Sequence, residues 1–193
     1  MPRLLGIGGI RVPRLFVALA DIPVWAELER LIASAIADLP GARPTPQAYR
    51  HVTLAFIGDV PQAMVAAIEG AMAGVAASAH AEGYALDRPG GFPRPEARIV
   101  ALTGATPQGL GRLALDLADR LRAAGIAVER RPLRMHVTVA RLRENRLIAT
   151  QFVPPLRVMA EEIRLYESEL LPAGARYHLV SRFALPHGDG ASA

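Results

Sequence analysis

Polar and apolar residues alternate along six stretches of the chain, with the period of two that is typical of half-buried strands. These stretches span residues 14–20, 51–58, 98–103, 136–141, 156–167 and 175–185. Three other stretches fit helical spacing and carry a proline at or near the first turn: 23–39, 61–79 and 107–124. Because strands and helices do not alternate regularly, the order predicts an α+β fold in which helices pack on mostly antiparallel sheets.

Residues with capping chemistry flank the expected helices. Asp21 and Asp59 stand just ahead of two of them, where a side-chain oxygen can accept hydrogen bonds from the first backbone N–H groups. Gly125 follows the third, at a position where a left-handed residue commonly ends a helix. Residues 88–95 are rich in Gly and Pro, and we expect a loop or a sheet edge there.

One short segment occurs twice, as HVTLA at 51–55 and as HVTVA at 136–140. Each copy ends a similar unit: an alternating strand, a helix, a loop rich in Arg and Pro, and the repeated strand. The two units predict an internal pseudo-twofold with the HVT strands as symmetry mates. We therefore expect one bilobal domain over residues 14–185, with a flexible leader at 1–13 and a frayed tail at 186–193.

The alternation assigns the repeated residues to faces. In the first copy His51 and Thr53 point to one side of the strand, while Val52, Leu54 and Phe56 point to the other and are predicted to enter the core. The second copy divides in the same way. Two strands that each present an imidazole beside a hydroxyl predict a single cleft with a histidine on either side.

The composition narrows the chemistry of this cleft. The 193 residues include no cysteine, which excludes thiol nucleophiles, disulfides and thiolate metal sites. All 22 basic residues are arginine, so a P-loop or a Schiff-base lysine is excluded as well. The net charge of +4 permits phosphate binding without suggesting a duplex-binding domain. No apolar run approaches the ~20 residues of a membrane span, and we expect a cytoplasmic protein without membrane contacts.

Most kinds of histidine chemistry fit this cleft poorly. Zinc requires three or four protein ligands, whereas each HVT strand supplies one. A serine triad lacks its G-x-S-x-G elbow, and no carboxylate pair is placed for glycoside hydrolysis. Two imidazoles with pKa values near 6.5 can act as an acid and a base at neutral pH, without metal or cofactor. They suit in-line displacement at phosphorus, where one histidine deprotonates the incoming oxygen and the other protonates the leaving oxygen.

Other polar side chains near the motifs can assist at a phosphate. The hydroxyls of Thr53 and Thr138 can donate hydrogen bonds to the non-bridging oxygens. Arg134 and Arg141 flank the second motif and can add positive charge. Strict alternation places Arg141 on the face opposite the motif histidine, so it reaches the phosphate only if the strand ends or bulges near Ala140.

At this point the chain resembles the 2H phosphoesterases, which carry two H-x-T/S motifs, and among them the RNA 2′,3′-cyclic phosphodiesterases also known as 2′-5′ RNA ligase-like proteins. The H-x-T motifs lie at 51–54 and 136–139. The wider resemblance rests on RLFVAL at 14–19, HVTLAFIG at 51–58, RRPLRMHVTVAR at 130–141 and LYESELLPAGARYHLVSRFAL at 165–185.

The resemblance implies a bilobal fold with the active cleft between two pseudo-symmetric lobes. It also implies metal-independent hydrolysis of RNA 2′,3′-cyclic phosphate ends to 2′-phosphates. Carried over by position, the family's catalytic histidines fall on His51 and His136, and its phosphate-binding residues on Thr53, Thr138 and Arg141. Of the two histidines, the sequence favours His51 as the acid and His136 as the base.

Four further residues are candidates for substrate contact. Arg50 stands before the first motif, where relatives commonly have an apolar residue, and is predicted at the cleft rim together with Arg134. Phe92 and Tyr177 could stack a terminal base. Because only 5% of the residues are aromatic, we expect recognition of an RNA terminus and not of a long sequence.

Three functions stay open at this stage. The first is hydrolysis of the cyclic phosphate, and the second is its reversal, in which a 5′-hydroxyl is joined to the cyclic end by a 2′-5′ bond. The third is a non-catalytic module that binds RNA ends or nucleotides. The expected partner is an RNA with a 2′,3′-cyclic phosphate end or a small cyclic nucleotide, and we expect a monomer.

Overall fold

The computed structural model describes residues 12–20, 26–150, 152–171 and 174–188. Almost all of the expected leader, the last five residues of the expected tail and the expected capping residue Asp21 lie outside the described residues. Within them, no helix is both long and apolar enough to cross a membrane.

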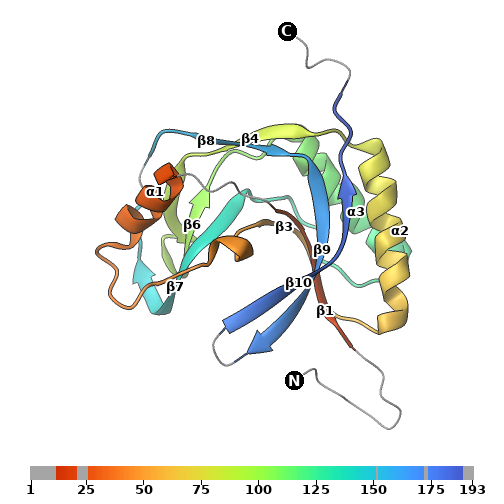
Figure 1. Cartoon of the computed structure of the whole chain (residues 1–193), viewed down its shortest axis with the longest axis horizontal. Helices are drawn as coiled ribbons and strands as arrows, with labels where there is room; N and C mark the ends of the chain where they lie inside the picture. Colours follow the sequence, from red (N-terminus) through yellow and green to blue (C-terminus); the bar gives the residue numbers. More distant parts are fainter. Residues whose placement is uncertain (1–11, 21–25, 151, 172–173, 189–193) are drawn as a thin grey trace.

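Two four-stranded antiparallel sheets form the two lobes (Figure 1). The first sheet has the order β10-β9-β1-β3 and is built from Arg14–Leu19 (β1), Val52–Asp59 (β3), Glu162–Leu171 (β9) and Gly174–Ala184 (β10). The second has the order β2-β7-β6-β5 and is built from Arg43–Pro44 (β2), Arg88–Phe92 (β5), Glu96–Thr103 (β6) and His136–Leu147 (β7). A two-stranded sheet of Glu82–Leu86 (β4) and Leu156–Ala160 (β8) lies across the top of the view in Figure 1.

The described residues form three α-helices and two short 3₁₀ turns. The helices are Ala26–Ile36 (α1), Val65–Ser78 (α2) and Gln108–Ala123 (α3), and the turns are Gln47–Tyr49 (η1) and Gln62–Met64 (η2). Although α1 follows a strand of the first sheet, it packs against β5 and β7 of the second. Conversely, α3 follows a strand of the second sheet but contacts β3 of the first sheet, beside α2. The two helices therefore cross between the lobes and tie them together.

The internal repeat is visible in the strand pairing. In the first sheet Ala18 lies opposite Thr53, and Leu19 opposite Val52. In the second sheet the equivalent pairs are Ala101 with Thr138 and Leu102 with Val137. The same short sequence, Val-Ala-Leu, thus pairs with the HVT segment in both lobes. The α+β class, the antiparallel pairing and the bilobal pseudo-symmetry predicted from the sequence are confirmed.

Several element boundaries differ from the sequence prediction. The stretch 156–167 is two strands, divided at Glu161, which pair with different sheets. The short strands β2 and β4 were not predicted, and β5 fills the Gly- and Pro-rich stretch as the edge of its sheet. Proline and glycine are rare in strand interiors but tolerated at edges, which explains why the pattern did not reveal β2 and β4, whereas β5 confirms the sheet edge that was one of the two expectations for 88–95.

The two helix ends that can be checked give opposite results. Gly125 has φ of +79° and follows α3, and the N–H of Ile126 donates to the carbonyl of Leu121, which confirms the predicted C-terminal glycine. Asp59 is not a cap. It is the last residue of β3 and its carboxylate lies 3.4 Å from Arg14, whereas α2 begins only at Val65 after the turn η2.

Candidate active site

Each HVT strand contains a bulge at the same position, and the bulge decides which side chains face the cleft. Against β1, the register skips Leu54 between Thr53 and Ala55; against β6, it skips Val139 between Thr138 and Ala140. An extra residue reverses the alternation beyond it. The carbonyl of Val139 accepts a hydrogen bond from the N–H of Thr45 at 2.8 Å, which anchors the second bulge to the chain beside β2.

The first bulge corrects the predicted core of β3. Val52 is fully buried as expected, but beyond Leu54 the buried residues are Ala55 and Ile57. Phe56, predicted to enter the core, is instead 50% exposed. Because the inserted residue shifts the alternation by one, Phe56 lies on the same face as the motif histidine.

The second bulge likewise changes the face of the strand from which the Arg141 side chain points. After Val139 the core positions are Ala140 and Leu142, both buried, so the exposed Arg141 returns to the face that carries His136 and Thr138. The positive charge of Arg141 also contributes to lowering the pKa of His51, in the other lobe. The bulge that the sequence argument required for Arg141 is therefore present.

The two histidines are held by identical backbone contacts. The Nδ1 atom of His51 lies 2.8 Å from the carbonyl oxygen of Tyr49, and Nδ1 of His136 lies 2.8 Å from that of Arg134. Because a carbonyl can only accept, Nδ1 carries the proton in both rings. This contact fixes the orientation of each ring and leaves Nε2 for proton transfer.

The aromatic surroundings of the two histidines differ. His136 is stacked on Phe92, with ring centroids 3.8 Å apart and planes 10° from parallel. The ring of His51 instead lies beside Phe16, with centroids 4.9 Å apart, and meets Tyr177 edge-on, with centroids 5.4 Å apart. The Arg134 guanidinium lies 4.6 Å from the centroid of Phe92, so this ring contacts both an imidazole and a cation.

Burial and nearby positive charge suppress protonation of both imidazoles. Burial lowers the pKa of His51 to about 4, the bond to the Tyr49 carbonyl opposes this, and the charges of His136 and Arg141 lower it further. Burial also lowers the pKa of His136, with additional lowering by Arg134 and Arg131. In the free protein both rings are therefore neutral at neutral pH.

This pKa shift predicts a loss of stability in acid. In the unfolded chain His51 takes up its proton near pH 6.5, whereas in the folded protein it does so only near pH 4, so the unfolded state binds more protons in this window. Between pH 7 and pH 4 the free energy of unfolding should fall by about 3 kcal/mol more in the wild type than in His51→Gln. Urea titrations of both proteins across this range measure the difference. Equal losses in the two proteins would show that His51 titrates normally.

A cavity of about 490 Å³ lies between the two lobes beside His136. It is lined from β3 by Thr53 and Phe56 and from the second sheet by His136 and Phe92, with Arg131 and Arg134 at its side. This volume lies within the range of small-molecule sites. Residues of both repeated motifs border this space, but His51, Thr138 and Arg141 are not among its lining residues.

The other candidates occupy different environments. Tyr177 lies in a cluster of aromatic rings with Phe16, Tyr49 and Tyr166, at centroid distances of 4.9 to 6.5 Å, so it is largely engaged by its neighbours. The sequence argument missed Tyr49 and Tyr166, because only the tertiary fold brings these residues together. The Arg134 side chain is exposed and donates to the carbonyl of Pro93 at 2.8 Å.

Arg50 does not lie at the rim of the cleft. It is 6% exposed, forms a two-pronged ion pair with Glu29 of α1 and donates from Nε to the carbonyl of Thr45 at 3.1 Å. The pair ties α1 to the segment that enters the first motif. The arginine that precedes the first motif therefore makes a structural contact here.

The Arg50 pair predicts a specific loss of stability. Glu29→Ala leaves a buried guanidinium without its carboxylate, and we expect the free energy of unfolding to fall by about 2 kcal/mol. The exposed Glu144 on β7 provides the control, since Glu144→Ala should change stability by no more than about 0.5 kcal/mol. Denaturant midpoints of the two variants test this, and equal values would refute the structural role of the pair.

Known proteins resemble this chain in sequence and in structure. The family model described as LigT like Phosphoesterase matches residues 22–101. An RNA 2′,3′-cyclic phosphodiesterase of Geobacillus stearothermophilus is 30% identical over 125 residues, which is 62% of this chain but only 40% of that enzyme. The crystal structure of E. coli LigT complexed with 3′-AMP has a TM-score of 0.69 at 27% identity, covering 91% of this chain and 99% of that one.

A second solved structure, from Thermus thermophilus, gives a TM-score of 0.70 at 25% identity and covers 90% of this chain and 98% of its own. The family model covers the first repeated motif, and the two solved structures share the fold over about nine tenths of the chain. In sequence and fold the chain is therefore similar to the LigT-like 2H phosphoesterases, although it spans less than half the length of the curated relative that it matches.

Proposed function

We propose that this protein hydrolyses RNA 2′,3′-cyclic phosphate ends to 2′-phosphates, with His51 and His136 as the acid–base pair. The observation that carries the proposal is the matched pair of imidazoles on β3 and β7, each fixed through Nδ1 by a backbone carbonyl. Support for the substrate comes from the relative in Geobacillus stearothermophilus and from the nucleotide bound to E. coli LigT.

The reaction is an in-line displacement at phosphorus. Water attacks the phosphorus opposite the P–O3′ bond, and Nε2 of one histidine takes up the proton that water loses. As the P–O3′ bond breaks, Nε2 of the other histidine donates a proton to O3′, which leaves a 2′-phosphate. The hydroxyls of Thr53 and Thr138 donate to the non-bridging oxygens, and Arg141 supplies a compensating positive charge.

The surroundings of the rings support one assignment of roles. His51, with a pKa near 4, is unprotonated at neutral pH and suits the base that activates water. Burial lowers the pKa of His136 in the free protein, so its role as the acid at O3′ depends on the bound phosphate, and the stacked face of Phe92 stabilises the imidazolium once it forms. This order is the reverse of the one that the sequence favoured. A bound phosphate supplies the negative charge that raises the pKa of the acid.

The proposed activity is tested with a labelled RNA that ends in a 2′,3′-cyclic phosphate, incubated in excess EDTA with and without an excess of RNA bearing a 5′-hydroxyl. We expect opening of the cyclic end in both mixtures. Accumulation of a longer product with the 5′-hydroxyl RNA and no opening without it would establish a ligase instead. Binding without any turnover would replace the proposal by a non-catalytic RNA-end module.

A further inference from the structure

Two arginines face each other across the β2–β7 pair next to the cleft. Arg43 is the direct partner of Arg141 in the antiparallel register, so their side chains leave the same face of the sheet. Both are exposed, and neither has a hydrogen bond or ion pair with another described residue. Like charges directly opposite each other destabilise a sheet, so this position is unfavourable unless an anion lies between the two guanidinium groups.

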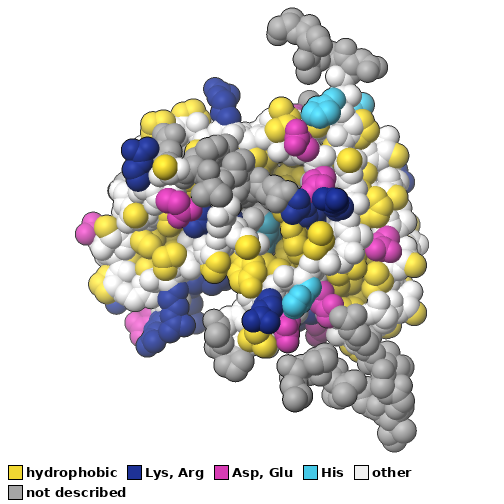
Figure 2. Space-filling view, viewed as in Figure 1, with side chains coloured by type: hydrophobic (Ala, Val, Ile, Leu, Met, Phe, Trp, Pro, Cys, Tyr) yellow, Lys and Arg dark blue, Asp and Glu magenta, His cyan; other side chains and the backbone are white. Residues whose placement is uncertain are grey.

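More arginines of the same kind continue from this pair. Arg143 and Arg146 follow on β7. Both are exposed and have no carboxylate partner among the described residues. Figure 2 shows basic side chains gathered at the lower left, over the end of β7. We call these four residues, Arg43, Arg141, Arg143 and Arg146, the arginine track.

Elsewhere in the described residues, arginines are commonly neutralised. Seven of them lie within ion-pair distance of a carboxylate: Arg14, Arg50, Arg88, Arg120, Arg130, Arg131 and Arg164. Two acidic residues lie nearby, Glu144 on β7 and Glu96 on the neighbouring β6, yet neither forms an ion pair with the arginines of the track. The positive charge of the track is therefore available to a ligand from solution.

We propose that the arginine track binds the sugar–phosphate backbone of the RNA strand whose cyclic end occupies the cleft, and that Arg43 holds the first internucleotide phosphate while Arg141, opposite it, faces the reacting phosphate. This inference rests on the proposed function and deepens it, because it makes an RNA strand, not a free cyclic nucleotide, the preferred substrate. Guanidinium groups bind phosphate oxygens with two parallel hydrogen bonds, and such contacts carry no base preference. Arg43 and Arg141 lie on the face of β7 that bears His136, and Arg143 and Arg146 continue the positive charge along the same strand.

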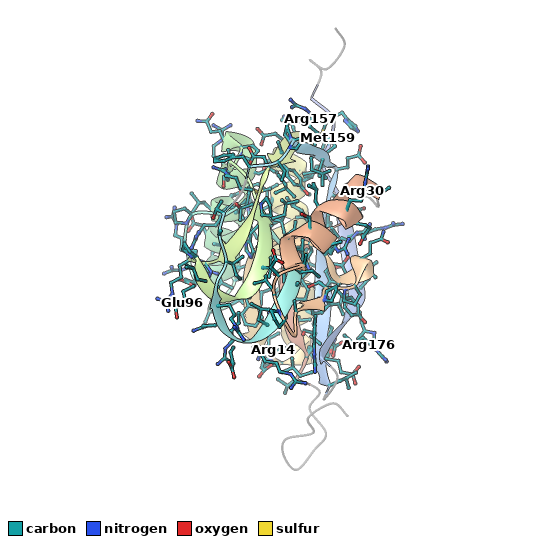
Figure 3. All side chains as sticks on the ribbon, turned by 90° about the vertical axis from the view of Figure 1, so that its left-hand side faces the viewer. Arg14, Arg30, Glu96, Arg157, Met159 and Arg176 are labelled. Atoms are coloured by element: carbon teal, nitrogen blue, oxygen red, sulfur yellow. The ribbon has the colours of Figure 1, made fainter. Side chains whose placement is uncertain are left out.

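The test compares two substrates with the same terminal nucleotide, a 2′,3′-cyclic mononucleotide and a short single-stranded RNA with a 2′,3′-cyclic end. For the wild type, kcat/KM should be higher for the RNA, and this advantage should shrink as salt increases. Arg43→Gln and Arg146→Gln should each reduce the ratio of kcat/KM for the RNA to kcat/KM for the mononucleotide by about fivefold. For the RNA, each should also reduce the slope of log kcat/KM against log salt concentration by about 0.7. Arg157→Gln is the matched control, because Arg157 is exposed on β8 at the top of Figure 3 and belongs to another sheet; its ratio should equal that of the wild type.

Three results would overturn the inference: an unchanged ratio in both track variants, an equal loss on both substrates, or the same loss in Arg157→Gln. Failure of the proposed function is recognised separately, because the wild type would then turn over neither substrate. In that event, fluorescence anisotropy with a 2′-phosphate-ended RNA still tests the track. Binding that weakens in Arg43→Gln and falls with salt supports it, and equal affinity in wild type and variant refutes it.

Discussion

Replacing His51 or His136 by alanine should lower kcat for opening of the cyclic phosphate at least about a thousandfold, while affinity for an RNA end changes little. General acid and general base catalysis by a positioned side chain each contribute about 10² to 10⁴. Because the two imidazoles act in the same step, removing both should cost little more than removing one. Single-turnover kinetics with saturating protein isolates the chemical step from binding.

The control for these variants is His178→Ala. His178 is exposed on β10 and its Nε2 lies 3.2 Å from Glu169, away from the motif strands in the sheet order. It should retain wild-type kcat. If either motif variant kept more than about a tenth of the wild-type kcat, the corresponding imidazole would not be an acid or base in the reaction.

The second large effect is expected at the motif threonines. Thr53→Val and Thr138→Val keep the shape and β-branching of the side chain but remove the hydroxyl donor. Loss of one donor to a developing oxyanion typically lowers kcat by about 10² to 10³, and we expect about a hundredfold for each variant. Comparison of kcat and KM shows whether the loss arises in the transition state or in ground-state binding.

Thr150→Val is a suitable comparison for the threonine variants, because Thr150 is exposed and lies after the end of β7. Its kcat should match that of the wild type. An unchanged kcat in both motif variants would mean that the hydroxyls do not contact the reacting phosphate, and the charge of Arg141 would then have to stabilise the transition state without them.

The sequence was most informative where local pattern and repetition agreed. The strict alternation in HVT fixed the direction of His51 and His136, and the repeat identified the two strands as equivalent. The helix ending at Gly125 follows from a local preference for left-handed glycine and was predicted for the same reason.

The sequence failed where the outcome depends on partners far along the chain. The bulges at Leu54 and Val139 depend on the register with β1 and β6, so the exposure of Phe56 could not be predicted from β3 alone. The prediction that Arg50 lies at the cleft rim was wrong because its partner Glu29 belongs to a helix more than twenty residues earlier in the chain. Such tertiary contacts override a strand pattern that is read in isolation.

The repeat also explains how two identical motifs can take different roles. Both histidines have the same backbone contact, so their difference comes from the surrounding rings. One imidazole is stacked flat on Phe92, and the other meets the edge of Tyr177. In the proposed mechanism, the pseudo-symmetric fold supplies two equivalent positions, and the neighbouring side chains assign one to the acid and the other to the base.

The most direct test of the two-histidine mechanism is phosphorus NMR of an RNA with a 2′,3′-cyclic phosphate end, in excess EDTA, with the wild type and with His51→Ala/His136→Ala side by side. The wild type should replace the cyclic phosphate resonance by that of a 2′-phosphomonoester, and the double variant should leave the cyclic resonance unchanged. Conversion by the double variant at the wild-type rate, or a 3′-phosphate product from the wild type, would contradict the mechanism.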